Sequence, residues 1–373
     1  MALILNEEQQ MLQDAARGFL RDRAPIEHLR SLRDRDIEDR VSLDLWAEMA
    51  EMGWPAILVP EAHGGLGYGY CGLGIVLEES GRTLTPSPLL STALTGVTAV
   101  TAGGSDTQCA DILPRVAAGE VLLALACDEA PRHAPDRVET RAEPMDGGFR
   151  LTGKKTGVHD GHSANLLIVS AATPDGLSLF LVPADTPGVN IERYPVLDIA
   201  AAANVHFDNV QLPADSVLGH IGNATPVLEH TLDAARVGVS AELLGIAQEA
   251  FERTMEYIKQ RKQFGVLVGG FQALQHRAAM LYADIELCKS LVLRALQVLD
   301  ETAGGDPELS SATKAKLCAT AHHAANEAIQ MHGGIGMTDE FDIGFFLKRC
   351  QILEALYGDR HFHYDRYARL RGY

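Results

Sequence analysis

The side chains best suited to hold an anionic ligand lie in one short stretch, KQRKQFGVLVGGFQ, at positions 259 to 272. A helical stretch ends there at Arg261 and Lys262, glycines interrupt it, and helical spacing resumes at Phe271 and Gln272. The start of a helix offers unpaired N–H groups and a partial positive charge, and arginine adds a planar fork that matches phosphate oxygens. The segment therefore indicates a phosphate site. A solvated pair of charges at a helix end is the plainer interpretation of the same residues.

A second glycine-containing segment, QMHGGIG, begins at Gln330 and ends at Gly336. Gly333 and Gly334 lack a Cβ atom, so the backbone here can approach a flat ligand closely. The same pattern is typical of a glycine that ends a helix, and Gln272 taken alone fits an exposed amide at a helix start. Each segment by itself leaves its function open.

The composition restricts the ligands and partners that we expect. The 373 residues carry a formal net charge of -18, so we expect neither a nucleic acid nor an anionic membrane surface as a partner. The 6 cysteines form no CxxC pair and show no zinc-finger spacing, which predicts reduced thiols in a cytoplasmic protein. The first residues, MALILNEEQQMLQDAARGFL, do not resemble a signal peptide, and no apolar run has the length of a membrane span.

Three regions of different periodicity would position these segments. Helical apolar spacing predominates first, as in the run from Glu8 to Leu20. From Val121 short apolar runs alternate with turn residues, which predicts a small β-sandwich or barrel. Helical spacing returns at Pro226 and predicts a four-helix bundle from the runs 226–263, 271–302, 308–331 and 343–369. We therefore expect a helical domain at 1–120, a β domain at 121–222 and a helical bundle at 223–373.

This order of elements, together with the two segments, resembles the acyl-CoA dehydrogenase family over essentially the whole chain. The most specific matches are Arg261-x-x-Phe264-Gly265, Phe271-Gln272 and the segment from Gln330 to Gly336. The resemblance implies the acyl-CoA dehydrogenase fold, FAD as the cofactor and a tetramer built from dimers. It also implies that these residues reach the pyrophosphate and the adenosine end of the FAD in a neighbouring subunit. The expected cofactor-binding residues are Arg261, Phe264, Phe271, Gln272, Gln330, Gly333 and Gly334.

The resemblance fails where the family keeps its catalytic base. Family members remove the α proton of an acyl-CoA thioester with a glutamate, and the β hydrogen leaves as hydride to the flavin. The usual position of that glutamate is Gly358 in this chain, and a second family position is Ala235. The family's tryptophan and threonine at the flavin ring correspond to Gly157 and His159. The Gly-Ser-Asp loop that covers the ring is missing after residues 128–132.

The retained and the changed residues differ in the site that they serve. Residues donated to a neighbour's FAD are kept, whereas residues that seat the chain's own flavin ring and perform the chemistry are changed. We therefore predict a non-catalytic, FAD-sharing subunit that assembles with a homologous catalytic acyl-CoA dehydrogenase subunit into an α2β2 heterotetramer. The family includes such heterotetramers in bacterial steroid side-chain degradation. The expected substrate is an acyl-CoA, either a steroid side chain or a long-chain or dicarboxylic acyl group. The expected electron acceptor is the electron-transfer flavoprotein.

Two other functions fit the same sequence. Asp359, one position from the missing base, would act as a displaced base in a self-sufficient homotetrameric enzyme, but its shorter arm and altered register argue against that role. A binding or scaffold protein would keep the fold without turnover. Asp233 and Arg236 match a family pair near the acyl-CoA, or form only an internal ion pair. The histidines at 322, 323, 361 and 363 have no carboxylate or cysteine at ligand spacing, so we expect no metal site.

Overall fold

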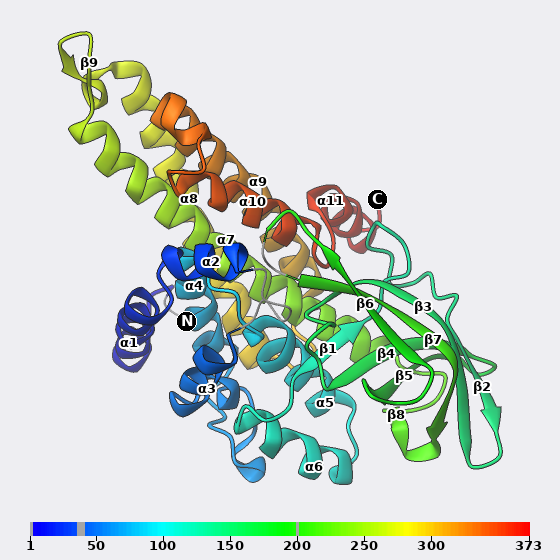
Figure 1. Cartoon of the computed structure of the whole chain (residues 1–373). Coiled ribbons are helices and arrows are strands. Elements are labelled where there is room, and N and C mark those ends of the chain that lie inside the picture. The colour runs from blue at the N-terminus through cyan, green and yellow to red at the C-terminus, as the bar shows by residue number, and fades with distance from the viewer. Residues whose placement is uncertain (1–2, 36–41, 199–200) are drawn as a thin grey trace.

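The first part of the chain is helical in the computed structural model, which describes residues 3–35, 42–198 and 201–373 (Figure 1). The first helix begins where the sequence offers a cap. The Asn6 side chain accepts a hydrogen bond from the Gln9 N–H (2.8 Å), and the Gln9 side chain accepts one from the Asn6 N–H (3.0 Å). The helices of this part are α1 (Glu7–Arg23), α2 (Ile26–Asp34), α3 (Leu43–Glu51), α4 (Tyr70–Thr83), α5 (Val97–Gly103) and α6 (Asp106–Ala117).

A buried π-helix, Leu89–Gly96, lies between α4 and α5 and connects the helical part to the sheet. The Thr92 hydroxyl accepts a hydrogen bond from Leu123 N (2.9 Å), at the start of the first strand. Wide π turns of this kind are rare and often lie at functional sites. The π-helix also packs against the rest of this first strand, β1 (Leu123–Ala126).

The middle of the chain forms an eight-stranded sheet with the order β6-β7-β3-β2-β4-β5-β8, and β1 joins β4 in parallel register. The two longest strands, β3 and β7, pair antiparallel with irregularities of register that bend them. Buried side chains from β1 to β7 form a core of their own. The strands are β1 (Leu123–Ala126), β2 (Arg141–Met145), β3 (Gly148–His159), β4 (Leu166–Thr173), β5 (Gly176–Pro183), β6 (Val189–Pro195), β7 (Ala201–Pro213) and β8 (Val217–Leu218).

The last part of the chain is a bundle of long helices, as predicted. The central helix α7 packs against both α4 and α9, and its residues 231–248 are therefore all buried. One predicted helix is wrong: the run 343–369 is divided at Tyr357 and Gly358, whose φ angles are 58° and 106°. An α-helix cannot continue through positive φ angles. The helices are α7 (Thr225–Gln260), α8 (Gln272–Glu301), α9 (Pro307–His332), α10 (Ile343–Ala355) and α11 (Arg360–Leu370).

A short hairpin projects from the end of the bundle, beyond α7 and α8 (Figure 1). Its strands, β9 (Lys262–Gln263) and β10 (Val266–Leu267), pair antiparallel across Phe264 and Gly265. Both turn residues have positive φ angles, 54° and 81°, as a tight two-residue hairpin requires. For this reason α7 ends at Gln260, before the predicted end at residue 263.

The helical part and the bundle share one large hydrophobic core, whereas the sheet has a separate one. The limits 1–120, 121–222 and 223–373 stay predictions for the three domains. Over the described residues, no helix combines the length and the hydropathy needed to cross a bilayer.

Candidate functional site

The first predicted cofactor-contacting segment lies at the projecting end of the bundle. Arg261 follows the last residue of α7, and its carbonyl accepts a hydrogen bond from Val268 N (2.9 Å), which closes the base of the hairpin. Phe264 at the hairpin tip is 92% exposed, and its ring meets Phe271 edge-on with 6.4 Å between centroids. Gln272 begins α8 and is also exposed. An aromatic ring this exposed indicates a contact surface for something outside the chain.

The second predicted segment lies where α9 ends and a short 3-10 helix, η6 (Gly333–Met337), begins. Gln330, Gly333 and Gly334 are all exposed. Gly333 has a φ of 67°, a conformation that favours glycine. A Cβ atom at Gly333 or Gly334 would meet no atom within 4 Å, so the backbone here is open to an approaching ligand. The structure thus places every predicted cofactor-contacting residue on the surface.

The two segments lie side by side at one end of the bundle. Tyr257, one turn before Arg261, stacks on His332, which directly precedes Gly333, with 4.3 Å between the ring centroids.

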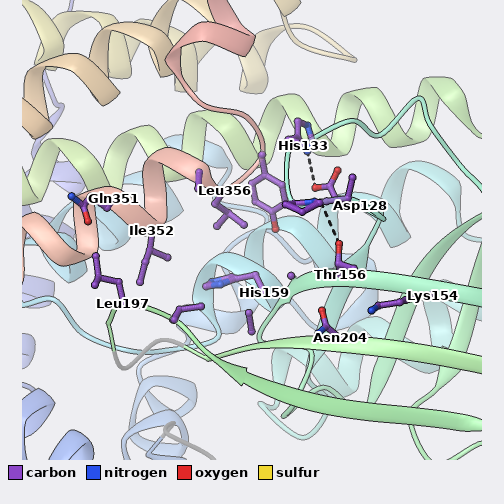
Figure 2. Close-up of a pocket in the computed structure, with 17 residues that line it drawn as sticks. Asp128, His133, Lys154, Thr156, His159, Leu197, Asn204, Gln351, Ile352 and Leu356 are labelled. Atoms are coloured by element: carbon purple, nitrogen blue, oxygen red, sulfur yellow. Dashed lines mark hydrogen bonds and ion pairs between the residues drawn. The ribbon is translucent and has the colours of Figure 1, made fainter.

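A separate cavity of about 490 Å³ lies between the sheet and α10 (Figure 2). Side chains from the sheet and the loop after β1 give it polar groups, and α10 and the loop after β6 give it apolar ones. These include Asp128, Lys154, Thr156, His159, Asn204, Leu197, Ile352 and Leu356.

Gly157, which matches the family's tryptophan at the flavin ring, opens onto this cavity. A Cβ atom at Gly157 would meet nothing within 4 Å, and its φ is 62°. His159, which matches the family's threonine, also lines the cavity. Its Nε2 lies 3.4 Å from Asp160 Oδ2, and that carboxylate oxygen also accepts a hydrogen bond from the Ser91 hydroxyl (2.6 Å). The ring-holding side chains are therefore absent here, and the histidine that replaces one of them has a partner outside the cavity.

The position predicted for the family's base is closed by packing. Gly358 is buried, and a Cβ atom there would lie 2.4 Å from Phe362 Cδ1 and 3.0 Å from His363 Nε2. Such distances require the neighbours to move, and the φ of 106° adds backbone strain for any other residue. The second family position, Ala235, is 0% exposed on α7. Gly358 therefore has no room for a carboxylate side chain without a rearrangement, and Ala235 is fully buried.

Asp359, the candidate for a displaced base, has a structural role in this geometry. Its Oδ1 accepts a hydrogen bond from Phe362 N (2.8 Å), so it is the N-cap of α11. Asp359 is not among the described residues that line the cavity of about 490 Å³. The structure therefore does not bring Asp359 together with the cavity.

The buried His133 side chain contacts residues that lie next to both positions predicted for the base. His133 Nδ1 lies 2.8 Å from Asp128 Oδ2, and His133 Nε2 lies 3.2 Å from Arg236 Nη2, beside Ala235. The His133 ring also packs edge-on against Phe362, with 4.9 Å between centroids. Burial lowers the pKa of His133, and Asp128 opposes that shift. A neutral ring that donates from Nδ1 to Asp128 and accepts at Nε2 from Arg236 satisfies all of these contacts.

Arg236 also belongs to a buried network of ion pairs. Its Nη1 lies 2.9 Å from Asp233 Oδ1, so the internal ion pair considered from the sequence is present. Asp233 accepts a second hydrogen bond from Arg366 Nη2 (3.0 Å), which also binds Glu229 (2.9 Å). Burial lowers the pKa of Arg236, and Asp233 opposes the shift. Arg236 Nε donates to the carbonyl of Tyr357 (3.3 Å), so the network holds the turn that contains the base position.

Cys127, Asp128 and His133 are the one group of possible metal ligands among the described residues, with ligand atoms within 4.8 Å of one another. Burial raises the pKa of the Cys127 thiol, which keeps it protonated. Asp128 already accepts hydrogen bonds from His133 and from Ala134 N (3.0 Å). These contacts favour a structural role for the group.

One of the four histidines for which the sequence predicts no metal site does have a carboxylate near it. His322 Nδ1 lies 3.5 Å from Glu354 Oε2.

Comparison with known proteins identifies the family to which this architecture belongs. The model of the acyl-CoA dehydrogenase N-terminal domain matches residues 6–120, and that of the acyl-CoA dehydrogenase C-terminal domain matches residues 225–370. The probable acyl-CoA dehydrogenase YngJ of Bacillus subtilis is 30% identical over 372 residues, which cover 94% of each protein. The chain belongs to the acyl-CoA dehydrogenase family.

Further relatives agree with this assignment. The mitochondrial 2-methylacyl-CoA dehydrogenase of Solanum tuberosum is 29% identical over 371 residues, 96% of this chain and 89% of the relative. A variant of the Tcur3481-Tcur3483 steroid ACAD is 33% identical, with a TM-score of 0.90 and 98% of both chains covered. The acyl-CoA dehydrogenase from Geobacillus kaustophilus is 26% identical, with a TM-score of 0.91 and 100% of both chains covered. The predicted acyl-CoA dehydrogenase fold is confirmed.

Acyl-CoA dehydrogenases are oxidoreductases that bind FAD, and the residues of this chain fit that cofactor in part. At the end of the bundle, an exposed arginine fork and the open backbone of Gly333 and Gly334 suit a phosphate-bearing ligand that arrives from outside. At the cavity, Gly157 offers no ring to a flavin, and His159 is paired with Asp160. The individual cofactor-binding roles stay predictions.

Sequence reasoning missed His133, which is central to the observed site. The available signal was the loop after β1, in which Asp128 and His133 stand five positions apart and the family's Gly-Ser-Asp is missing. The partner Arg236 lies 103 positions further along the chain, so no local pattern connects it with His133.

Proposed function

We propose that this chain is the FAD-sharing, non-catalytic subunit of a hetero-oligomeric acyl-CoA dehydrogenase that desaturates an acyl-CoA thioester. The observation that carries the proposal is the closed base position at Gly358, in a chain whose cofactor-contacting residues are all exposed. A homologous catalytic subunit supplies the glutamate that removes the α proton. The same subunit also holds the flavin ring. FAD, held in part by Arg261 and the Gly333–Gly334 backbone of this chain, would supply the acceptor for the β hydrogen of the acyl-CoA.

The chain's own residues serve the partner's cofactor in this proposal. Arg261 binds the pyrophosphate through its guanidinium, which suits phosphate better than a lysine would. Phe264, Phe271 and Gln272 contact neighbouring parts of the cofactor. The adenosine end lies against Gln330 and the open backbone of Gly333 and Gly334. The exposure of these residues supports the proposal, because a set that served only this chain would be expected to face inward.

Exposed apolar side chains support an assembly with another subunit. Phe264 is 92% exposed, Met280 on α8 is 72% exposed and Met337 in η6 is 79% exposed. Large apolar side chains that gather on a surface usually mark a protein interface. The similar steroid ACAD carries a name that joins two designations, Tcur3481 and Tcur3483, which favours a heteromeric partner and a steroid acyl group for this chain. The assembly that we propose is an α2β2 heterotetramer that passes its electrons to an electron-transfer flavoprotein.

The decisive experiment is a count of flavin. The chain is coexpressed with a family member that has an intact glutamate and Gly-Ser-Asp loop, and the purified complex is assayed for FAD against protein mass. We expect one FAD per heterodimer, and we expect the chain alone to purify without FAD and without desaturase activity toward a ferrocenium acceptor. One FAD per chain, or turnover by the chain alone, would instead support the self-sufficient enzyme. A chain that binds no partner and no flavin would support the scaffold.

A further inference from the structure

The two segments that we assign to the partner's FAD come from distant parts of the sequence and need a fixed spacing. Arg261 follows α7, and Gly333 follows α9. Each is preceded by a ring. Tyr257 lies one helical turn before Arg261 and accepts a hydrogen bond from its N–H at the carbonyl (2.9 Å). His332 directly precedes Gly333. A contact between these two rings would therefore set the distance between the two segments.

The two rings do make such a contact. Their centroids lie 4.3 Å apart with an interplanar angle of 26°, so they are stacked. The Tyr257 hydroxyl also donates to the His332 carbonyl (3.3 Å), the last carbonyl before the glycine turn. His332 Nδ1 donates to the carbonyl of Ala328 (2.7 Å), which fixes the ring against the last turn of α9. The end of α7 is thus joined to the end of α9 by a stack and by a hydrogen bond.

The chain that leaves the glycine turn returns to the same stack. Phe341 lies 4.9 Å from the His332 ring and 6.2 Å from the Tyr257 ring, centroid to centroid. Two arginines of α2 bind carboxylates on either side of Phe341. Arg33 binds Asp339 (2.7 Å and 3.0 Å). Arg30 binds Asp342 (2.8 Å and 3.0 Å). The turn is therefore anchored before its two glycines by the His332 stack and after them by Phe341 and these two ion pairs.

The stability of the fold alone does not explain a histidine at position 332. The ring is 3% exposed, and Nε2 has no hydrogen-bond partner among the described residues. A buried polar atom without a partner lowers stability, so an apolar side chain would be the simpler choice for a core. Departures of this kind from good packing tend to occur where a site must be positioned. The hydrogen bond of Nδ1 to Ala328 requires an imidazole or a similar ring donor.

We propose that Tyr257 and His332 are positioning residues that set the spacing between Arg261 and the Gly333–Gly334 backbone, so that both contact one FAD of the partner subunit. This inference rests on the proposed function, because it assumes that both segments serve that cofactor. Neither ring needs to touch FAD, since each acts through the neighbouring segment.

The test is a cycle of variants in the assembled complex, with the FAD dissociation constant and the thermal midpoint measured for each. Tyr257→Ala removes the stack, and we expect about tenfold weaker FAD binding, a size typical of coupled neighbours. Tyr257→Phe keeps the stack and should retain most of the affinity. In an Arg261→Ala background, Tyr257→Ala should weaken FAD binding by less than about twofold further, because the residue it positions is gone. Phe251→Ala is the control, since Phe251 packs on Tyr282 (5.9 Å) further back in the bundle. It should lower the thermal midpoint without changing FAD affinity.

The outcomes separate the inference from the function on which it rests. If Arg261→Ala weakens FAD binding but Tyr257→Ala has no effect, or has an equal effect in both backgrounds, the positioning role is wrong and the proposed function stands. The positioning role is also wrong if Phe251→Ala weakens FAD binding as much as Tyr257→Ala does, because the effect then follows stability. If Arg261→Ala itself leaves FAD binding unchanged, the proposed function is wrong. Should Tyr257→Ala fail to fold, His332→Gln and Tyr257→Leu, each in both backgrounds, provide the same comparison.

Discussion

Replacing Gly358 with glutamate restores the carboxylate that the family uses as its base, and we expect it to damage the chain without creating a catalyst. The new Cβ atom would lie 2.4 Å from Phe362 Cδ1, and such overpacking costs roughly 1–3 kcal/mol. The φ of 106° adds a backbone strain of roughly 1–3 kcal/mol for a residue other than glycine. Together these give roughly 2–6 kcal/mol, a large part of the 5–15 kcal/mol that is typical of a folded protein.

Two measurements check this expectation. Urea denaturation of the Gly358→Glu chain gives the loss in the free energy of unfolding. Desaturation of an acyl-CoA by a complex whose catalytic subunit has lost its own glutamate shows whether the new carboxylate works, and we expect no turnover. Gly157→Ala is the matched control, since Gly157 also has a positive φ (62°) but a Cβ atom there would meet nothing within 4 Å. It should cost only the strain, about 1 kcal/mol, so a markedly larger loss in the Gly358→Glu chain reports the packing around Phe362 together with the greater strain at that φ.

One result would refute the reasoning about the closed site. A Gly358→Glu chain that unfolds within about 0.5 kcal/mol of the parent, which is the size of a neutral surface substitution, would show that the space around Phe362 opens readily. Turnover by the same variant in the complex without the partner's glutamate would show in addition that this chain seats a flavin ring. The proposed division of labour between the subunits would then be wrong.

The remaining predictions concern the cofactor surface, the capping carboxylate and the response to acid. Arg261→Ala in the complex should weaken FAD binding roughly ten- to a hundredfold, as the loss of a charge-assisted hydrogen bond does, and flavin release on dilution measures it. Asp359→Asn keeps a good helix cap and should leave turnover of the complex nearly unchanged, so abolished turnover would make Asp359 the base. Burial lowers the pKa of His363 to about 2, so the unfolded chain binds a proton first and stability falls as the pH drops below about 6.5. His363→Met should therefore lose about 2 kcal/mol less than the parent between pH 6.5 and 5, and urea denaturation at both values checks this.

The long helices and six of the strands were predictable because runs of apolar residues mark them, whereas the mostly exposed β2 and the two-residue β8 were not predicted. The break between α10 and α11 has a signal in Gly358 and in Asp359, the N-cap of α11, but the φ of 58° at Tyr357 has none, since tyrosine has no intrinsic preference for it. Contacts from elsewhere impose it. Arg236 donates to the Tyr357 carbonyl (3.3 Å), and the buried Lys314 ammonium donates to the Gly358 carbonyl (3.2 Å). A tertiary hydrogen bond of this kind leaves no trace in the local pattern of residues.

The short helix α2 was also missed, although it carries two of the arginines that anchor the glycine turn. Its nine residues, IEHLRSLRD, are too few for a firm helical period, and most of them are polar. The predicted cofactor-contacting residues, by contrast, were singled out by the resemblance of their spacing to the family pattern, and their roles stay predictions. What the spacing did not reveal is their exposure, which depends on how α7, α8 and α9 end at the same place.

The buried charged groups near the predicted base position are paired with one another and do not require a catalytic glutamate. A base that is simply removed would leave nearby buried cations unpaired, which is costly. Here Arg236 and Arg366 are balanced by Asp233 and Glu229, and His133 accepts one further hydrogen bond from Arg236, so these two cations are paired without a glutamate.

On the surface, by contrast, the side chains of Arg261 and Phe264 are exposed. Within the part of the chain that the structure describes, the Arg261 side chain makes no hydrogen bond or ion pair, and the Phe264 ring is 92% exposed. An exposed phenylalanine contributes little to the stability of its own chain, because the apolar area that it would bury stays in water. Packing within the chain therefore accounts for the glycine at 358, but it does not account for Phe264 or Arg261. A contact with another subunit would account for both, and under the proposed function the phosphate-bearing cofactor of that subunit gives the arginine its partner.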